Sequence, residues 1–209
     1  MQKQGILTIV SGFSGVGKGT IMERLLKEYP KDYCLSISAT TRTKRTGEVD
    51  GVNYFFITKE EFEAMIRDDR LLEYAQYVDN YYGTPKAFVV DKLNQGINVI
   101  LEIEMQGALK IKKQYPEALL IFVAPAKASD LSDRLHGRKT ETEEQIQSRR
   151  ARAAQETVYM KDYDYIVIND VVERATREIH EIITNERDRV LRRGDFIDAL
   201  TEQLKNMAP

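Results

Sequence analysis

Residues 12–20 read Gly12-Phe13-Ser14-Gly15-Val16-Gly17-Lys18-Gly19-Thr20, and they directly follow an apolar, strand-like stretch at residues 6–10. The glycines of this run let the backbone turn tightly and point its N–H groups inward at an anion. A helix that begins near Lys18 adds the positive end of its dipole at the same place. The order of strand, glycine-rich loop and helix therefore predicts a phosphate-binding loop, with all nine residues around the phosphates of a nucleotide.

Two side chains of this loop carry the expected chemistry. Lys18 is placed to reach the β- and γ-phosphates of ATP, and Thr20 is placed to offer its hydroxyl to Mg²⁺. The usual pattern has Ser or Thr directly after the lysine, where this chain has Gly19, so the metal contact falls to Thr20. The alternative is a glycine-rich turn without a ligand, which the order of strand, loop, lysine and hydroxyl disfavours.

Composition limits the classes of protein to which the chain can belong. Its 209 residues, 42% hydrophobic and 31% charged, suit one globular domain with a sizeable core. The net charge of −2 argues against a general nucleic-acid-binding protein. The single cysteine, Cys34, excludes an internal disulfide and a multi-cysteine zinc site. With no visible signal peptide and no apolar run near the ~20 residues of a membrane span, we expect a cytoplasmic protein without a membrane partner.

The pattern along the chain predicts the architecture. Helix-like segments alternate with Val- and Ile-rich runs at residues 6–10, 99–103, 119–123 and 165–168. This alternation predicts an α/β fold with a parallel sheet flanked by helices on both faces. The phosphate loop after the first strand makes this fold one of the P-loop NTPase type.

Two additions and a tail are expected around this core. Aromatic alternation and a capping box of Thr58 and Glu61 indicate a small α+β insertion, and an Arg- and Glu-rich stretch indicates a helical lid. A helix is expected at residues 175–193, followed by Gly194 and a second helix whose apolar stripe packs on the body or on a second subunit, as in a homodimer. The expected boundaries are a domain at 5–184, with core at 5–35, 95–131 and 154–184, insertion at 36–94 and lid at 132–153, and a helical extension at 185–209.

The segment at residues 36–48 is the most specific after the phosphate loop. Arg42 and Arg45 lie among several hydroxyl side chains in a loop-like setting. Two guanidinium groups can grip one phosphate with paired hydrogen bonds, which lysines do poorly. An Arg-x-x-Arg pair alone is usually a solvated surface, but the hydroxyls and the phosphate loop favour a second phosphate site.

From about residue 5 to about residue 184 the chain resembles the guanylate kinases, in order and at family spacing. Besides the phosphate loop, the matching motifs are Ser-x-Thr-Thr-Arg-x-x-Arg-x-Gly-Glu at 38–48, Asp50-Gly51-x-x-Tyr54-x-Phe56, Asn80-Tyr81-Tyr82-Gly83-Thr84, Glu102-Ile103-Glu104-Met105-Gln106-Gly107, Arg134-Leu135 with Arg138, and Ile168-Asn169-Asp170. The resemblance implies transfer of the ATP γ-phosphate to GMP, and also to dGMP, with Mg²⁺ bound.

The resemblance also implies roles for acceptor-site residues. The GMP phosphate is expected to be held by Arg42, Arg45, Tyr54 and Tyr82, although the two tyrosines alone could be ordinary hairpin packing. The guanine base is expected to lie among Ser38, Glu73, Thr84 and Glu104, with Glu102 nearby and acting through Mg²⁺-bound water. Thr84 could instead cap a helix, because it precedes Pro85, and Glu104 stands where the family often has Asp.

Lid and adenine-side residues follow from the same resemblance. The family's lid arginines match Arg134, Arg138 and Arg149, which would neutralise charge on the transferring phosphoryl group. Asn169 is expected at the adenine side of ATP, with a plain strand-ending turn as the alternative. Arg150 and Arg152 are expected to be solvated.

Two other functions are compatible with parts of this pattern. One is a non-catalytic guanylate-kinase-like module that binds phosphopeptides, which Lys18, Thr20 and the lid arginines disfavour. The other is a kinase for a different phosphorylated acceptor, which Glu73 with Tyr54 and Tyr82 disfavours.

Overall fold

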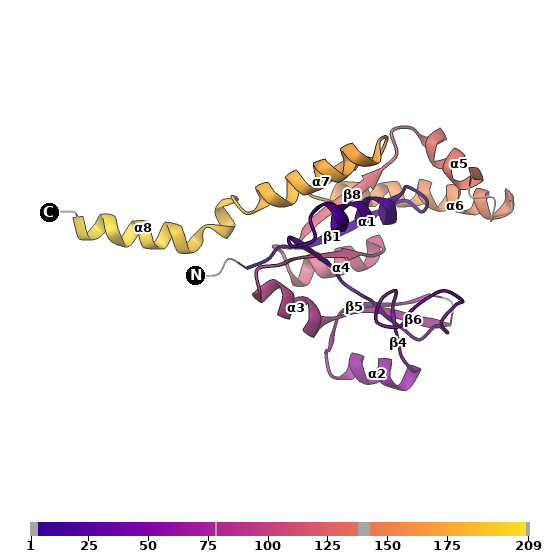
Figure 1. The fold of residues 1–209 in the computed structure, drawn as a ribbon, viewed down its shortest axis with the longest axis horizontal. Coiled ribbons are helices and arrows are strands. Elements are labelled where there is room, and N and C mark those ends of the chain that lie inside the picture. Colours follow the sequence, from indigo (N-terminus) through magenta and orange to yellow (C-terminus); the bar gives the residue numbers. More distant parts are fainter. Residues whose placement is uncertain (1–3, 78, 138–142, 208–209) are drawn as a thin grey trace.

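The computed structural model describes residues 4–77, 79–137 and 143–207. Its centre is a sheet of five parallel strands in the order β2-β7-β1-β8-β9 (Figure 1). The strands are β1 (Leu7–Gly12), β2 (Tyr33–Leu35), β7 (Asn98–Glu102), β8 (Leu119–Ala124) and β9 (Tyr165–Ile168). Four of them confirm the strands predicted from the Val- and Ile-rich runs. β2 escapes prediction because three residues are too few to show an alternating pattern.

Helices cover both faces of this sheet, as predicted. α1 (Lys18–Glu28) and α7 (Val172–Glu186) pack on one face, and α3 (Lys86–Asn94) and α4 (Met105–Gln114) on the other. Adjacent residues of β1 point to opposite faces, so Val10 joins the cluster with α1 and α7, whereas Ile9 joins the cluster with α3 and α4.

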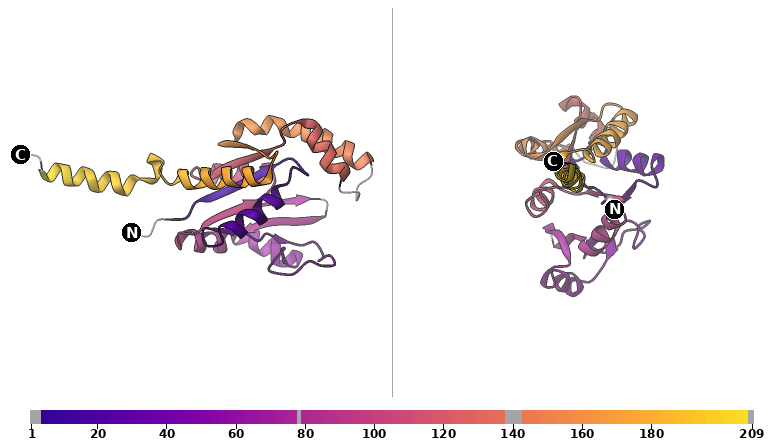
Figure 2. Two further views of the ribbon diagram at one scale, coloured as in Figure 1. Left: turned by 45° about the horizontal axis from the view of Figure 1, so that its top comes forward. Right: turned by 90° about the vertical axis from the view of Figure 1, so that its left-hand side faces the viewer.

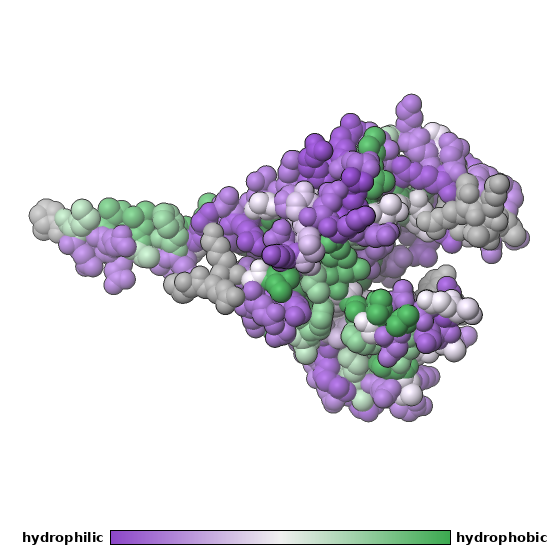
Figure 3. Space-filling model, viewed as in Figure 1, coloured by the Kyte–Doolittle hydropathy of each residue, from purple (hydrophilic) through white to green (hydrophobic). Residues whose placement is uncertain are grey.

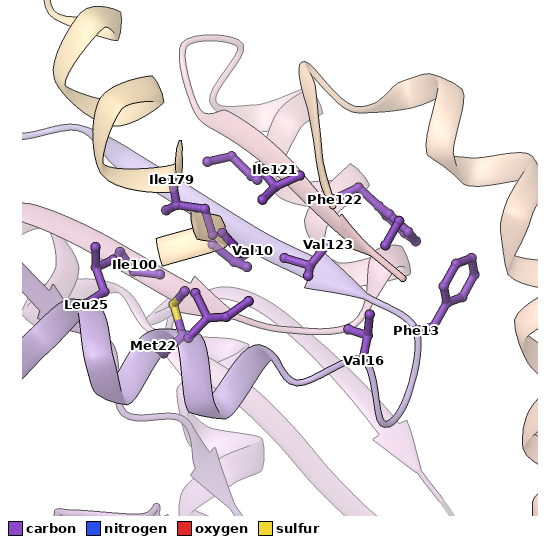
Figure 4. Close-up of a cluster of buried hydrophobic side chains, with 14 of the residues drawn as sticks. Val10, Phe13, Val16, Met22, Leu25, Ile100, Ile121, Phe122, Val123 and Ile179 are labelled. Atoms are coloured by element: carbon purple, nitrogen blue, oxygen red, sulfur yellow. The ribbon is translucent and has the colours of Figure 1, made fainter. Parts of the chain in front are cut away.

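The first of these clusters fixes the phosphate loop to the sheet. Figure 4 shows Met22 and Leu25 of α1 and Ile179 of α7 lying over Val10 of β1. Each of these four side chains is at most 2% exposed, and burial of such a side chain stabilises the fold by about 1.5–3 kcal/mol. The helix that follows the loop is therefore held in place by packing that is independent of any ligand.

A second, four-stranded sheet lies to one side of the core in the order β4-β3-β6-β5. Its strands are β3 (Ala39–Thr40), β4 (Phe55–Phe56), β5 (Leu71–Tyr77) and β6 (Asn80–Pro85), with α2 (Lys59–Arg67) packed on them through Phe62. The capping box of α2 is confirmed, because the Thr58 side chain accepts from the Glu61 N–H and the Glu61 carboxylate accepts from the Thr58 N–H.

Two helices rise over the opposite end of the core. They are α5 (Ala128–Gly137) and α6 (Glu143–Glu156), and a 3-10 turn, η1 (Thr157–Asp162), leads from α6 back to β9. Ile146 of α6 is 3% exposed and belongs to the same buried cluster as Val16 of the phosphate loop. Packing thus brings the Arg-rich lid segment next to the loop.

The C-terminal region differs from the prediction. α7 ends at Glu186 rather than at residue 193, and the short turn η2 (Val190–Arg192) separates it from α8 (Gly194–Met207). Gly194 is therefore the first residue of a helix and does not end one. α8 projects away from the body (Figures 1 and 2), none of its residues is buried, and the expected packing of its stripe on the body is wrong. No helix in the described part of the chain is long and apolar enough to cross a membrane.

Candidate active site

The phosphate loop turns sharply between the end of β1 and the start of α1. Gly15 and Gly17 have φ angles of 85° and 96°, in the left-handed region that favours glycine. A Cβ atom on Gly17 would lie 2.7 Å from Nδ2 of Asn169, so the position is also sterically closed to larger residues. Gly17 gives α1 no side-chain cap, which leaves the first N–H groups of the helix to an anion.

The side chains of the loop point in different directions. Nζ of Lys18 lies over the loop and donates to the carbonyl oxygens of Gly12 at 2.8 Å and Phe13 at 3.3 Å. The Phe13 ring packs edge-on against Phe122 with a centroid distance of 5.0 Å, so this residue anchors the loop in the core (Figure 4). Because its side chain is packed in the core, Phe13 can contact a phosphate only through its backbone. Thr20, in the first turn of α1, is exposed.

Two side chains carry oxygen atoms that could hold a divalent cation, Glu102 at the end of β7 and Thr20 in the first turn of α1. The Glu102 carboxyl stands at the end of β7, where surrounding protein desolvates it and raises its pKa, an effect that Lys18 partly offsets. Thr20 and Glu102 supply the hard oxygen ligands that Mg²⁺ prefers, and Mg²⁺ usually completes its shell with water and substrate phosphates. Among the described residues no three His, Cys, Asp or Glu side chains form a metal-binding group. Any such ion would need further oxygen ligands from water or bound phosphates.

The second phosphate site predicted from the sequence is centred on Arg42. Its two Nη atoms donate to the two oxygens of Glu48 at 3.0 and 2.8 Å, and its guanidinium lies 5.4 Å from the centroid of Tyr54. The rings of Tyr54 and Tyr82 meet at 6.1 Å. Arg45 joins the group through its backbone N–H, which donates to Glu48 at 2.8 Å.

Glu48 is a residue of this site to which the motif alone assigns no role. The hydrogen bonds from Arg42 and Arg45 lower the pKa of its carboxyl to about 2, so it stays ionised at neutral pH. It fixes the plane of the Arg42 guanidinium before any ligand arrives. Its place after Gly47, at the end of the motif, was the only signal in the sequence.

A half-buried carboxylate forms the next part of the site. Thr84 is fully buried, and its hydroxyl donates to Oε1 of Glu73 at 2.8 Å. Burial raises the pKa of Glu73, which the bond from Thr84 and the charge of Lys110 partly oppose. The alternative role of Thr84 as a helix cap is wrong, because the residue before α3 is Pro85 and no side chain caps that helix. Ser38 stands just before β3, and its carbonyl accepts the N–H of Phe55 at 2.9 Å.

The lid arginines differ in what they contact. Arg149 donates to the Ser14 hydroxyl at 2.6 Å, directly above the phosphate loop. Arg134 donates to the carbonyl oxygens of Val16 and Asn169, each at 2.7 Å, and so joins the loop to the end of β9. Arg138 lies outside the described residues.

Asn169 holds the loop from the other side. It is 1% exposed, and its Nδ2 donates to the Val16 carbonyl at 2.7 Å. Asn169 therefore braces the phosphate loop against the end of β9. Its Oδ1 is buried and has no hydrogen-bond partner in the described part of the chain.

Arg152 is exposed, as predicted, but it also forms an ion pair with the core. Its Nη2 donates to Oε2 of Glu104 at 2.8 Å, and its Nε donates to Glu156 at 2.8 Å. Glu104 is the residue before the first turn of α4, so this ion pair joins the lid helix α6 to the core. Both side chains are at least half exposed, which limits the pair to about 0–1 kcal/mol of stabilisation.

We expect Arg134→Ala to lower the free energy of unfolding by about 1.5–3 kcal/mol, because two backbone carbonyls lose a charged donor. Urea unfolding measures this change. Arg150→Ala, an exposed residue on α6, is the control and should be neutral. An Arg134→Ala protein as stable as wild type would show that the two hydrogen bonds of Arg134 do not stabilise the fold.

A hollow separates two parts of the molecule. Figure 3 shows the surface recessed between the part that carries α5 and α6 and the part that carries the second sheet. The phosphate loop, Arg42 with its tyrosines, and Glu73 with Thr84 are contributed by different elements of the chain. The arrangement offers groups for two anions and for a polar ring.

Comparisons with known proteins agree with this geometry. A family model described as guanylate kinase matches residues 4–186. The guanylate kinases of Clostridioides difficile (strain 630) and Caldanaerobacter subterraneus subsp. tengcongensis are 51% and 49% identical over 203 residues, which cover 97% of this chain and 98% of each relative. The crystal structure of guanylate kinase from Anaplasma phagocytophilum matches with a TM-score of 0.73 and 27% identity, over 91% of this chain and 90% of that one. The chain belongs to the guanylate kinase family.

Proposed function

We propose that this chain transfers the γ-phosphoryl group of ATP to GMP, giving ADP and GDP, and that it also accepts dGMP. Its close relatives are guanylate kinases. The observation that carries the choice of acceptor is the half-buried Glu73 carboxylate, held at 2.8 Å by Thr84. Guanine offers two donors, N1–H and its 2-amino group, to such a carboxylate. Adenine has an acceptor at N1 and no 2-amino group, so the carboxylate would be left poorly paired.

The proposed reaction needs alignment and charge neutralisation more than covalent help from the protein. An oxygen of the GMP phosphate attacks the γ-phosphorus of ATP. The bond from that phosphorus to the β–γ bridging oxygen breaks, and ADP leaves with the electron pair. The attacking phosphate is already anionic, so no residue has to remove a proton.

Residues of the loop and the lid supply the positive charge for this step. The negative charge of the phosphoryl group during its transfer is neutralised by Lys18, Arg134, Arg138 and Arg149. Mg²⁺, when held by the Thr20 hydroxyl and through water by Glu102, supplies further positive charge at the β- and γ-phosphates. Backbone N–H groups of the loop hold the rest of the triphosphate, and Asn169 is assigned to the adenine side of ATP.

Acceptor binding is assigned to the second sheet and to α4. Arg42 and Arg45, with the phenol groups of Tyr54 and Tyr82, hold the GMP phosphate. Four residues surround the base: Ser38, Glu73, Thr84 and Glu104. Glu48 supports this proposal, because it sets the Arg42 guanidinium in a fixed plane at no cost to the binding step.

A coupled assay of ADP release tests the proposal directly. Mg²⁺–ATP is offered with GMP, dGMP, AMP, UMP or CMP in turn. We expect turnover with GMP and dGMP and little with the other three. Silence with every acceptor would overturn the proposal and favour a binding module, whereas preference for a different acceptor would identify another phosphotransferase.

The proposed reaction places the protein in purine nucleotide metabolism, where it returns GMP to the diphosphate pool. We assign it to the cytoplasm, where its nucleotide substrates are found. The unpaired Cys34 is consistent with a reducing compartment.

We also propose that α8 pairs with α8 of a second copy of this chain. Ile197, Leu200, Leu204 and Met207 follow a three-four-three spacing, which forms a seam along one face of the helix. Their exposed fractions run from 41% for Leu200 to 80% for Met207, and Figure 3 shows the apolar face standing clear of the body. The seam contains no charged residue, so it is complementary to itself.

Removal of residues 194–209 tests this pairing. We expect light scattering to report a dimer for the full chain and a monomer for the truncated protein. GMP kinase activity should be retained, because α8 projects away from the body of the molecule (Figure 1). An unchanged mass would show that α8 does not join two copies.

A further inference from the structure

Gly107 is a buried glycine whose backbone does not require a glycine. It is the third residue of α4, and its φ is not among the positive values that this chain reserves for loop glycines. Alanine would fit such a helical backbone better than glycine does. The reason for a glycine here must therefore be space.

The space beside Gly107 is occupied by the acceptor-site carboxylate. A Cβ atom at this position would lie 2.9 Å from Oε2 of Glu73, 3.3 Å from its Cδ and 3.3 Å from Cδ1 of Ile103. The other oxygen of Glu73 is already fixed, because Oε1 accepts from Thr84 at 2.8 Å. The carboxylate thus lies between the Thr84 hydroxyl, which fixes Oε1, and the Cα of Gly107, which leaves room for Oε2.

A methyl group at position 107 would move the carboxylate but would not disturb the fold. The closest atom is the far end of a flexible side chain, which can rotate away, whereas the helix and the sheet stay in place. A carboxylate that reads two donors on one ring depends on its position, and a displacement of about 1 Å can cost on the order of 10²-fold in an enzyme.

We propose that Gly107 is a specificity-determining residue: its bare Cα creates the space in which Glu73 presents its carboxylate to the guanine base. This inference rests on the proposed GMP kinase function, and it adds to it a residue that does not itself touch the substrate through a side chain. Gly107 acts by positioning Glu73.

Gly107→Ala, tested in the full chain, separates this role from a structural one. We expect the Kd for GMP, measured by calorimetry, and the KM for GMP to rise by roughly 10–100-fold. The KM for ATP should stay within about twofold, because the phosphate loop is not involved. The melting temperature should be unchanged or higher by up to about 4 °C, as expected for alanine in a helix. The kcat/KM for GMP divided by the kcat/KM for AMP should fall.

Gly194→Ala is the matched control. Gly194 also lies in the first turn of a helix, and a Cβ there would meet nothing within 4 Å. GMP binding and melting temperature should both match wild type. A general effect of glycine replacement would appear in both variants.

A compensating change provides the second test. Glu73→Asp shortens the side chain by one methylene and alone should weaken GMP binding. Combined with Gly107→Ala, the shorter acid leaves room for the new methyl group, so the loss in the double variant should be smaller than the product of the two single losses. Independent, multiplicative losses would overturn the steric argument.

Two further outcomes would overturn the proposal. One is wild-type GMP binding in Gly107→Ala. The other is a parallel loss of ATP binding, GMP binding and melting temperature, which would show that the variant disrupts the fold. Wild-type protein that binds GMP without phosphorylating it would refute the proposed reaction alone, and the calorimetric comparison would still decide the role of Gly107.

Discussion

Lys18→Ala is expected to lower kcat by on the order of 10²–10³-fold, the effect of removing one preorganised positive group from a charged transition state. Lys18 begins α1, and its Nζ lies within 2.8 Å of the Gly12 carbonyl oxygen, above the glycine-rich turn. A bound triphosphate offers this ammonium a stronger partner than the two carbonyls it contacts here. The gain is larger in the transition state, where charge moves toward the bridging oxygen.

Steady-state kinetics with Mg²⁺–ATP and GMP measure this loss. The control is Lys27→Ala, an exposed lysine in the last turn of the same helix, which should keep wild-type rates. The melting temperature of Lys18→Ala should stay close to wild type, because the helix is held by Met22 and Leu25 in the core. Wild-type kcat in this variant would remove Lys18 from the mechanism.

Glu73→Gln is expected to lower kcat/KM for GMP by roughly 10²–10³-fold, since two charge-assisted hydrogen bonds to guanine are worth about 1.5–3 kcal/mol each and one amide oxygen cannot replace them. The amide nitrogen of the variant also opposes a donor on the base. The KM for ATP should not change. Activity with AMP should not fall, because adenine gains nothing from the carboxylate.

The same carboxyl sets the acid limit of the activity. Burial raises the pKa of Glu73 above that of a free glutamate, so GMP binding should weaken at a higher pH than an exposed acid would give. This acid limb of the pH profile should vanish in Glu73→Gln. The stability effect has the opposite sign: a raised pKa in the folded state favours the protonated form, and that stability is lost as the pH rises through it.

Glu73→Gln should therefore melt at the wild-type temperature or above it at neutral pH, while losing GMP turnover. Glu60→Gln, on the exposed surface of α2, is the control and should change neither property. A variant that melts lower and keeps its preference for GMP would show that Glu73 is a structural group.

The local pattern of the sequence was sufficient for the core of the fold. β1, the phosphate loop and α1 follow one another within 22 residues, from Leu7 to Glu28. Each step has a short-range cause: Val and Ile runs for the strands, glycines for the left-handed turn, and Thr58 with Glu61 for the start of α2. The motif at residues 38–48 likewise brings Arg42 and Glu48 together, because they lie on one loop.

The end of α7 could not be predicted from the local sequence pattern. The charged, amphipathic pattern continues to residue 193, but the helix stops at Glu186. Glu186 is 2% exposed and its carboxylate lies 2.9 Å from Arg189 and 3.6 Å from Arg192. The chain turns around this buried acid, and no periodicity reports that a glutamate will be buried.

The class of fold, the phosphate loop and the family could all be predicted from the sequence, because each depends on motifs of residues that are neighbours along the chain. The contacts between distant side chains could not be predicted in this way. They include Glu73 with Thr84 and with the Cα of Gly107, and Arg152 of the lid with Glu104. The projection of α8 away from the body also appears only in the structure. Glu73 and Gly107 are 34 positions apart in the sequence, and Glu104 and Arg152 are 48 positions apart. Such contacts depend on how whole helices and strands pack, whereas a sequence pattern shows only which face of each element is apolar.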